Sequence, residues 1–383
     1  MTVLDADLLA RIRSRAAGYD RDNAFFVDDL DELRAAGYLA SRPLLEVARD
    51  QRLLAAHAPA TALGIGMHLV VVGIARVLHE RGDGSLDWIL DDAAAGELFA
   101  FGNSEAGNDR VMFDSRTVAA PQPDGSYLFT GTKIFTSLSP AWTRLVVFGR
   151  DDTDAASPTL VHGAITRDTP GHHTVGDWNP LGMRATQSLT TVLDGARVDP
   201  GRITRMLPVG PVADPYIFGL FADFLLLISS VYAGIADRAL ELAVENVASR
   251  RSLATGATYS EDPDIRWQLA DAAMALDSLA PQIESLAGDV DALVDHGSAW
   301  FRLLVGTKTR SVDVARTVVE AAIRVSGGSS YSADTELSRL YRDALAGLFH
   351  PSDPESAHAT VATNLLGPLG PSQETKAATQ ADA

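Results

Sequence analysis

The order of hydrophobic periodicities along the chain constrains the fold more than any other feature of the sequence. Apolar residues recur three and four positions apart in residues 1–97, as they do in amphipathic helices. From residue 98 to about residue 205 the apolar segments are short and rich in β-branched and aromatic residues, with Gly, Pro and Asp between them. Such segments are typical of strands. Helical spacing returns in residues 206–366.

This order predicts an α+β, mainly α, protein with three domains. We expect an N-terminal α-helical domain at 1–97, a middle β-barrel or sandwich at 98–205 and a C-terminal helical bundle at 206–366. The gaps between the predicted strands are too short for the helices that connect parallel strands, so the strands should be antiparallel. Residues 367–383 are small and polar, and we expect a disordered tail there.

The charge balance and the lack of cysteine exclude several functional classes. The net charge is −18, and lysine occurs only at Lys133, Lys308 and Lys376. The chain therefore lacks the basic face that nonspecific binding to nucleic acid requires. Without cysteine there are no disulfides, thiolate metal ligands or cysteine nucleophiles, and the N-terminal segment lacks the apolar core of a signal peptide. We expect a cytoplasmic protein.

One apolar segment approaches the length of a membrane span. Residues 218–236 read "FGLFADFLLLISSVYAGIA", but Asp223 interrupts the run and an amphipathic pattern follows it. We therefore expect a buried helix rather than a transmembrane one. Burial of this helix across subunits predicts a homotetramer.

Motifs for nucleotide loops and metal ions are incomplete. "GIGMHL" has Gly64 and Gly66 but Leu69 where a dinucleotide-binding loop needs a third glycine. "GTKT" at 306–309 lacks the preceding glycine of a phosphate loop, and no histidine has a metal-binding partner at helical spacing. We therefore expect neither a nicotinamide domain nor a metal site.

Four other segments, in this order, resemble conserved motifs of the acyl-CoA dehydrogenase superfamily. They are "FAFGNSEAGND" (99–109), "GSYLFTGTKIFTSLSP" (125–140), "WNPLGMRATQSLTTVLDGARVDPGRI" (178–203) and "RVSGGSSYSADTELSRLYRDA" (324–344). The resemblance covers residues 1 to about 366. It implies that family's fold, in which the C-terminal domain is a four-helix bundle, and a flavin-dependent oxidoreductase.

The same segments imply which residues contact the flavin. By resemblance to the family, the ring of the cofactor is contacted by Ser104, Phe135, Thr136 and Ser137. Backbone groups of Gly327 and Gly328, together with the side chain of Arg250, would hold the pyrophosphate of an FAD bound to a neighbouring subunit. The segment around Arg250 departs from the family pattern, so FAD is expected and FMN stays open as the cofactor.

The catalytic glutamate that dehydrogenases of the family carry shortly after "RDA" is missing here. His350 and Pro351 occupy this neighbourhood, and the next acids, Asp353 and Glu355, lie outside the family's position. In some relatives the glutamate comes from an earlier helix, but Glu241 and Glu245 are offset from that position. No acid is therefore assigned as the base.

His350 resembles a feature of another branch of the superfamily, the dibenzothiophene monooxygenase type. Those enzymes have a histidine at the same distance after their "R-[ND]-A" motif, a serine matching Ser137 and a histidine in an early buried helix, which His68 resembles. The resemblance implies His350, Ser137 and His68 as catalytic residues of a monooxygenase that uses reduced flavin and O₂. His68 as a hydrogen-bonded core residue and His350 as a helix cap are the structural alternatives.

Three functions therefore stay open. The expected one is a monooxygenase that acts on a small-molecule substrate and receives reduced flavin from a flavin reductase. The alternatives are a thioester dehydrogenase with a non-standard base, which would pass electrons to an electron-transferring flavoprotein, and a non-catalytic flavoprotein subunit. The sequence does not identify the substrate, because enzymes of this fold accept thioesters, aromatic compounds, amino sugars and polyketides.

Overall fold

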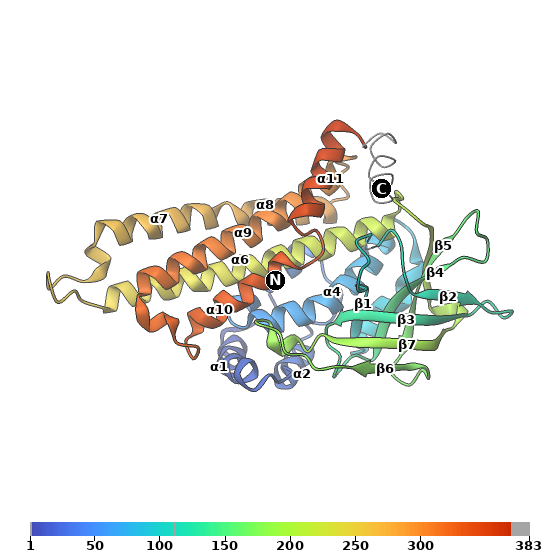
Figure 1. Ribbon diagram of the computed structural model, residues 1–383, viewed down its shortest axis with the longest axis horizontal. Helices are drawn as coiled ribbons and strands as arrows, with labels where there is room; N and C mark the ends of the chain where they lie inside the picture. The colour runs from blue at the N-terminus through green and yellow to red at the C-terminus, as the bar shows by residue number, and fades with distance from the viewer. Residues whose placement is uncertain (1, 111, 369–383) are drawn as a thin grey trace, which may run out of the picture.

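The computed structural model describes residues 2–110 and 112–368, so residues 369–383 of the predicted tail lie outside the described part. The described chain consists of a sheet with helices before and after it in the sequence (Figure 1). The helices that precede the sheet are α1 (Ala6–Asp22), α2 (Val27–Ala35), α3 (Leu44–Ala55), α4 (Pro59–Glu80) and α5 (Asp87–Ala94). The predicted fold class, α+β and mainly helical with a middle sheet, is confirmed.

Eight strands form one sheet in the order β6-β7-β3-β2-β4-β5-β8, with β1 paired to β4. They are β1 (Phe99–Gly102), β2 (Val118–Pro121), β3 (Tyr127–Thr136), β4 (Arg144–Asp151), β5 (Thr159–Thr166), β6 (His172–Val175), β7 (Leu189–Val198) and β8 (Ile203–Pro208). Most neighbours are antiparallel, as the short connections require, whereas β1 and β2 each pair with β4 in parallel. The β3–β7 ladder breaks between Lys133 and Thr136, just where the predicted cofactor segment begins.

The helices after the sheet are α6 (Pro215–Ser249), α7 (Pro263–Asp277), α8 (Leu279–Asp291), α9 (Ala299–Ser326), α10 (Glu336–Leu345) and α11 (Pro354–Leu366). Helices α6 to α9 pack along one another as a bundle, and the sheet lies beyond one end of α6 (Figure 1). Asp262 starts α7 by accepting hydrogen bonds from the amides of Asp264 and Ile265, and Asp353 does the same for α11 at Ser356.

Two helices of the described chain, α4 and α6, are long and apolar enough to cross a membrane. Their most apolar windows are 94% and 89% buried inside the protein, respectively. A helix that is apolar on all sides is also typical of a protein core. Helix α6 contains the apolar run around Asp223, and it contacts α3, α4 and α9. It is therefore the central helix of the fold.

The helices before the sheet, the sheet region and the closing helices meet at the segment that follows Pro180. The backbone amide of Met183 donates to Oδ1 of Asp343 in α10 at 2.5 Å. The Arg342 guanidinium forms an ion pair with Asp20 of α1, to which its Nη1 donates at 2.9 Å. Nε of Arg184 donates to the carbonyl oxygen of Asp20 at 2.8 Å. One short segment thus fixes α10 against both α1 and the sheet.

Gly182 is the point of closest approach in this junction. A Cβ atom at this position would overlap the backbone carbonyl group of Arg342. We expect Gly182→Ala to lower the free energy of unfolding by about 1–3 kcal/mol, because backbone must move to relieve the overlap. Urea denaturation measures this change. Gly201→Ala is the matched control, since a Cβ there meets no atom within 4 Å, and an equal loss in both variants would contradict the argument.

Candidate active site

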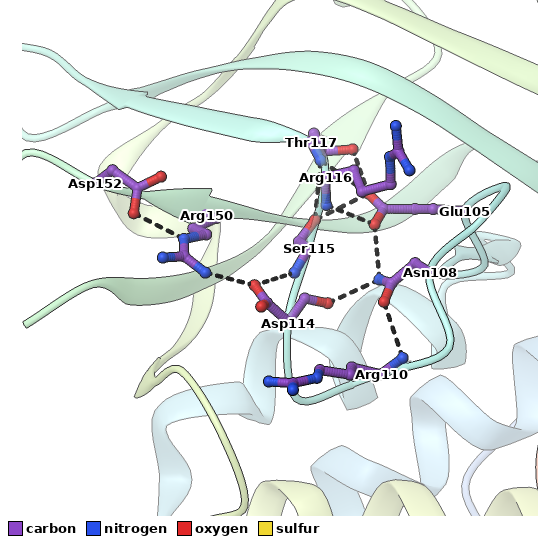
Figure 2. A network of polar contacts seen from close by, with 9 residues as sticks. All are labelled: Glu105, Asn108, Arg110, Asp114, Ser115, Arg116, Thr117, Arg150 and Asp152. Atoms are coloured by element: carbon purple, nitrogen blue, oxygen red, sulfur yellow. Dashed lines mark hydrogen bonds and ion pairs between the residues drawn. The ribbon is translucent and has the colours of Figure 1, made fainter. Parts of the chain in front are cut away.

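The loop after β1 is attached to the sheet by a buried carboxylate. Oε1 of Glu105 accepts hydrogen bonds from Nζ of Lys133 at 2.7 Å, from Oγ1 of Thr117 at 2.6 Å and from Oγ of Ser115 at 2.8 Å. Oε2 accepts from the amide of Arg116 at 2.7 Å. Figure 2 shows Ser115, Arg116 and Thr117 beside the carboxylate. Both carboxylate oxygens of Glu105 therefore accept hydrogen bonds, and the donors lie on β3 and on the segment that leads into β2.

Lys133 and Glu105 form an ion pair inside the protein. The lysine is fully buried and its ammonium lies 4.1 Å from the centre of the Phe148 ring. Burial lowers the pKa of Lys133 to about 8 against the opposing effect of Glu105. Burial of Glu105 acts to raise its pKa, but Lys133 and the hydrogen bonds outweigh this and lower it to about 2. Both groups are therefore charged at neutral pH.

A second set of contacts closes the loop on its outer side. Nδ2 of Asn108 donates to Glu105 and to the carbonyl oxygen of Asp114, both at 2.9 Å. Arg150 of β4 donates to Asp114 at 2.9 Å and to Asp152 at 2.7 Å (Figure 2). The loop is thus held from both sides, which fixes the preceding residue, Ser104.

The four residues predicted to contact the flavin ring come from two adjoining segments. The carbonyl oxygen of Ser104 accepts a hydrogen bond from the amide of Ile134 at 2.8 Å, so the loop lies against the end of β3. Phe135 follows in a left-handed backbone conformation (φ 56°). The residue is 57% exposed, and its ring meets Trp178 edge to face. Thr136 and Ser137 are buried next to it. The structure therefore brings these predicted residues together.

The polar atoms near these segments fit the edge of a flavin ring. Among the described residues, Oδ1 of Asn103, Oγ1 of Thr136 and Nε1 of Trp178 are buried without a hydrogen-bond partner. Buried polar atoms are nearly always paired in native proteins, so these three indicate a ligand or water. An isoalloxazine ring offers both acceptors and an N–H donor at its edge, and the exposed ring of Phe135 supplies an apolar wall.

A line of hydroxyl groups leads away from Ser137. Its Oγ lies 2.8 Å from Oγ of Ser188, which lies 2.8 Å from Oγ1 of Thr186. Thr186 donates to the carbonyl oxygen of Met183 at 2.9 Å, and the amide of Met183 donates to Asp343. The predicted cofactor segment is therefore connected by hydrogen bonds to the beginning of the segment that carries His350.

His350 lies seven positions after Asp343 in the chain. Its Nε2 is 3.0 Å from the hydroxyl of Tyr232, a fully buried residue of α6. Burial and the nearby Lys308 ammonium lower the pKa of His350 to about 3. Burial, with a smaller effect of Asp343, raises the pKa of Tyr232 well above its usual value. A neutral imidazole thus shares a hydrogen bond with a protonated phenol at neutral pH.

His68 has a different environment. Its Nε2 lies 2.8 Å from the carbonyl oxygen of Leu39, and its Nδ1 accepts from the amide of Phe99 at 3.1 Å. Burial lowers the pKa of His68 to about 4. Because both ring nitrogens are engaged with backbone, this geometry favours the structural alternative, in which His68 joins α4 to β1. It is not connected to His350 or Ser137.

The predicted pyrophosphate residues form a separate group. The Arg250 guanidinium donates to the carbonyl oxygen of Ser326 and lies 4.9 Å from the centre of the Tyr259 ring. Gly327 ends α9 at φ +77°, and a Cβ there would lie 2.9 Å from Nη1 of Arg250. Gly328 follows directly. Arg250 follows α6 and Gly327 follows α9, and both helices end on the side of the bundle away from the sheet (Figure 1), so within one chain this group does not reach the Phe135 segment.

The acids considered as alternative bases cap a helix, face Arg238 or lie exposed. Asp353 caps α11, and Glu355 is exposed in the first turn of that helix. Glu241 and Glu245 are more than half exposed and face Arg238. The buried acid nearest to His350 in sequence is Asp343, which we did not single out from the sequence although it is the aspartate of the "RDA" motif.

Asp343 makes the stability of the fold depend on pH. Burial raises its pKa to about 6, so the folded chain binds its proton more tightly than the unfolded chain does. The protonated carboxyl group therefore contributes to the stability of the fold at low pH, and this contribution is lost as the pH rises from about 4 to 6. As the pH rises from acid to neutral, we expect the free energy of unfolding of Asp343→Asn to increase by up to about 3 kcal/mol relative to that of the wild type. Denaturation of both proteins at several pH values measures the difference, and parallel pH curves would contradict it.

The comparisons with known proteins agree with this geometry. Residues 226–352 match the family described as acyl-CoA dehydrogenase, C-terminal domain. Amino sugar nitrososynthase RubN8 of Streptomyces rubradiris is 28% identical, over 91% of this chain and 85% of the relative. Dibenzothiophene monooxygenase of Mycolicibacterium goodii is 28% identical over 67% and 65%, and putative acyl-CoA dehydrogenase YdbM of Bacillus subtilis is 27% identical over 88% of each chain.

Solved structures show the same fold. KijD3 in complex with FMN and dTDP-3-amino-2,3,6-trideoxy-4-keto-3-methyl-D-glucose has a TM-score of 0.80 and 26% identity, covering 94% of this chain and 92% of that chain. Butyryl-CoA dehydrogenase from Megasphaera elsdenii has a TM-score of 0.80 at 18% identity, covering 96% and 100%. The fold and the site define an oxidoreductase of the flavin-dependent type. These matches confirm the resemblance to the acyl-CoA dehydrogenase superfamily that the sequence motifs indicated.

Proposed function

We propose that the protein is a flavin-dependent monooxygenase that uses reduced flavin and O₂. The observation that carries this proposal is the neutral imidazole of His350, held by Tyr232. It lies in the segment after the "RDA" motif, where the resemblance implies that dehydrogenases carry their glutamate. A group with a pKa of about 3 is a poor base for removing a proton from carbon at neutral pH. The same neutral imidazole is well suited to donate a hydrogen bond in a site that excludes water.

The residues around Phe135 would hold the flavin. The Phe135 ring would pack on the isoalloxazine, and the unpaired oxygens of Asn103 and Thr136 would meet its polar edge. The bound reduced flavin supplies the electrons with which O₂ gives one oxygen atom to the substrate and one to water. FAD and FMN are both compatible with these contacts, because they contain the same ring.

His350 and Ser137 would act on protons at the reacting centre. When the Tyr232 hydroxyl donates to Nε2, the neutral imidazole carries its proton on Nδ1 and can donate it to a bound ligand. Ser137 is fixed by Ser188 and Thr186, so its hydroxyl keeps one orientation. His68 has no such role in this proposal, because both of its nitrogens are engaged with backbone.

The relatives indicate the substrate class. Two of them, RubN8 and the L-evernosamine nitrososynthase of a Micromonospora species, match over 91% of this chain and are named as nitrososynthases. We therefore propose that the oxygen is transferred to the amino nitrogen of an amino sugar. Aromatic substrates, as in dibenzothiophene monooxygenase, are the second choice. The proposal includes a separate flavin reductase as partner, a homotetrameric assembly and a cytoplasmic location.

An assay with a flavin reductase, a nicotinamide cofactor and O₂ tests this function. We expect an oxygenated product from a nucleotide-linked amino sugar and none from acyl thioesters. The alternative, a dehydrogenase, is favoured by the 27% identity to YdbM. In that case, anaerobic mixing with acyl-CoA would bleach the bound flavin. Bleaching without O₂, or failure to bind flavin in either redox state, would contradict the proposal.

A further inference from the structure

Lys308 is buried within the helical bundle, and its hydrogen bonds with the described residues are all to backbone. It belongs to α9, and 1% of it is exposed. Its ammonium donates to three carbonyl oxygens, those of Gly347 at 3.0 Å, His350 at 3.2 Å and Ser352 at 2.8 Å. An ammonium has three N–H donors, so each donor has one acceptor in this six-residue segment.

This arrangement differs from that of the other described lysine. Lys133 is buried against the carboxylate of Glu105, whereas the ion pairs found among the described residues include none for Lys308. Burying an ammonium without a carboxylate is unfavourable unless its donors are satisfied. The chain otherwise relies on arginine for positive charge. The role of this buried lysine is therefore to bind the carbonyl groups that it contacts.

The segment that Lys308 binds has no regular helical hydrogen bonds of its own to hold it in place. A short turn, Ala346–Leu348, ends the helical structure of α10, so the carbonyl groups that follow have no helical partner. Pro351 has no N–H to donate, and Ser352 has a left-handed backbone (φ 55°). A cation at this end of a helix is also favoured by the helix dipole.

The same contacts set the position of the His350 imidazole. Gly347 lies so close to α9 and α6 that a Cβ there would come within 2.7 Å of Val312 and 2.8 Å of Tyr232. With the carbonyl oxygens on both sides of Pro351 bound to one ammonium, the His350 backbone keeps the orientation that brings Nε2 to the Tyr232 hydroxyl.

We propose that Lys308 is a positioning residue that holds His350 in its working orientation by binding the backbone of residues 347–352. It acts through the backbone and touches neither substrate nor cofactor. The proposal deepens the proposed function and rests on it for the role of His350, whereas the hold on the segment itself can be measured without any reaction.

Hydrogen–deuterium exchange of the resting protein tests the hold. We expect Lys308→Met to speed exchange in residues 346–353 by about 10- to 100-fold, the range that corresponds to losing charged hydrogen bonds in local opening. Exchange in the sheet should stay unchanged. Lys308→Gln, with a shorter side chain and fewer donors, should give an intermediate increase. Ser311→Ala is the matched control, because Ser311 is buried on the same helix and its hydroxyl has no partner among the described residues.

A second test uses the wild-type protein alone, so it does not depend on whether a variant folds. Burial lowers the pKa of Lys308 to about 8, and the acids that act on it, Asp353 and Asp313, only partly oppose this. His350 and Tyr232, the other titratable groups at this place, keep one protonation state at neutral and mildly alkaline pH. Exchange in residues 346–353, corrected for its intrinsic pH dependence, should therefore rise as the pH passes about 8.

Activity separates this proposal from the proposed function. With a reductase and O₂, Lys308→Met should lower product formed per reduced flavin by about tenfold or more, while flavin affinity changes little. Unchanged exchange in residues 346–353 would overturn the positioning role, as would faster exchange throughout the molecule. If His350→Ala leaves oxygen transfer intact although Lys308→Met loosens the segment, the proposed function fails and the hold on the segment stands.

Discussion

Replacing Glu105 by Gln is expected to lower the free energy of unfolding by about 3–5 kcal/mol, because it leaves the Lys133 ammonium buried without its counter-charge. Lys133 is fully buried, and its one ion pair among the described residues is with Glu105 at 2.7 Å. Glutamine keeps the size of the side chain and can still accept from Thr117. The loss therefore reports on the charge, and chemical denaturation at neutral pH measures it.

The double variant Glu105→Gln/Lys133→Met serves as the internal check. Removing both charges should restore a large part of the stability, since the uncompensated ammonium is then gone. Asp152→Asn, at the exposed end of the same network, should change stability by less than about 1 kcal/mol. If the double variant is as unstable as the single variants combined, the pair is not coupled and the electrostatic explanation is wrong.

His350→Ala is expected to lower product formed per reduced flavin by about 10²–10³-fold, the usual loss when one preorganised donor is removed from an active site. The imidazole meets Tyr232 but none of the residues predicted to bind the flavin, so flavin affinity should be nearly unchanged. O₂ consumption should continue with hydrogen peroxide as the product. Parallel assays of product, O₂ and peroxide measure the uncoupling.

His358→Ala is the matched control for this substitution. His358 lies eight positions further on, exposed on α11, and its Nδ1 forms a hydrogen bond with the carbonyl oxygen of Pro354. It should behave as the wild type. Equal product yields in His350→Ala and the wild type would remove the central support of the proposed function, and Tyr232→Phe should then also be without effect.

The fold could be predicted from the sequence because its signals are local. The change from helical to strand periodicity near residue 98 and back near residue 206 matches the described strands, which run from Phe99 to Pro208. The apolar run around Asp223 indicated a buried helix, and this signal too lies within one segment. Each of these signals is contained in one segment, so no knowledge of distant contacts was needed.

The candidate site was only partly predictable because its decisive contacts join distant residues. Tyr232 and His350 are 118 positions apart, and Met183 and Asp343 are 160 apart. Nothing in the sequence around Tyr232 or Lys308 marks either residue as a neighbour of His350. His68 shows the converse limit, since a histidine in an apolar helix has the same pattern whether it binds backbone or substrate. Only the three-dimensional arrangement separates the two.

The ion pair between Asp20 and Arg342 has a practical consequence for protein engineering. Trimming the amino-terminal helix would remove the acidic partner of the arginine that precedes Asp343, and with it a brace 322 positions away in the chain. Fusion tags and chimaeric exchanges should therefore leave the first 22 residues in place. The amino-terminal helix of this enzyme therefore helps to hold the segment that carries His350 in place.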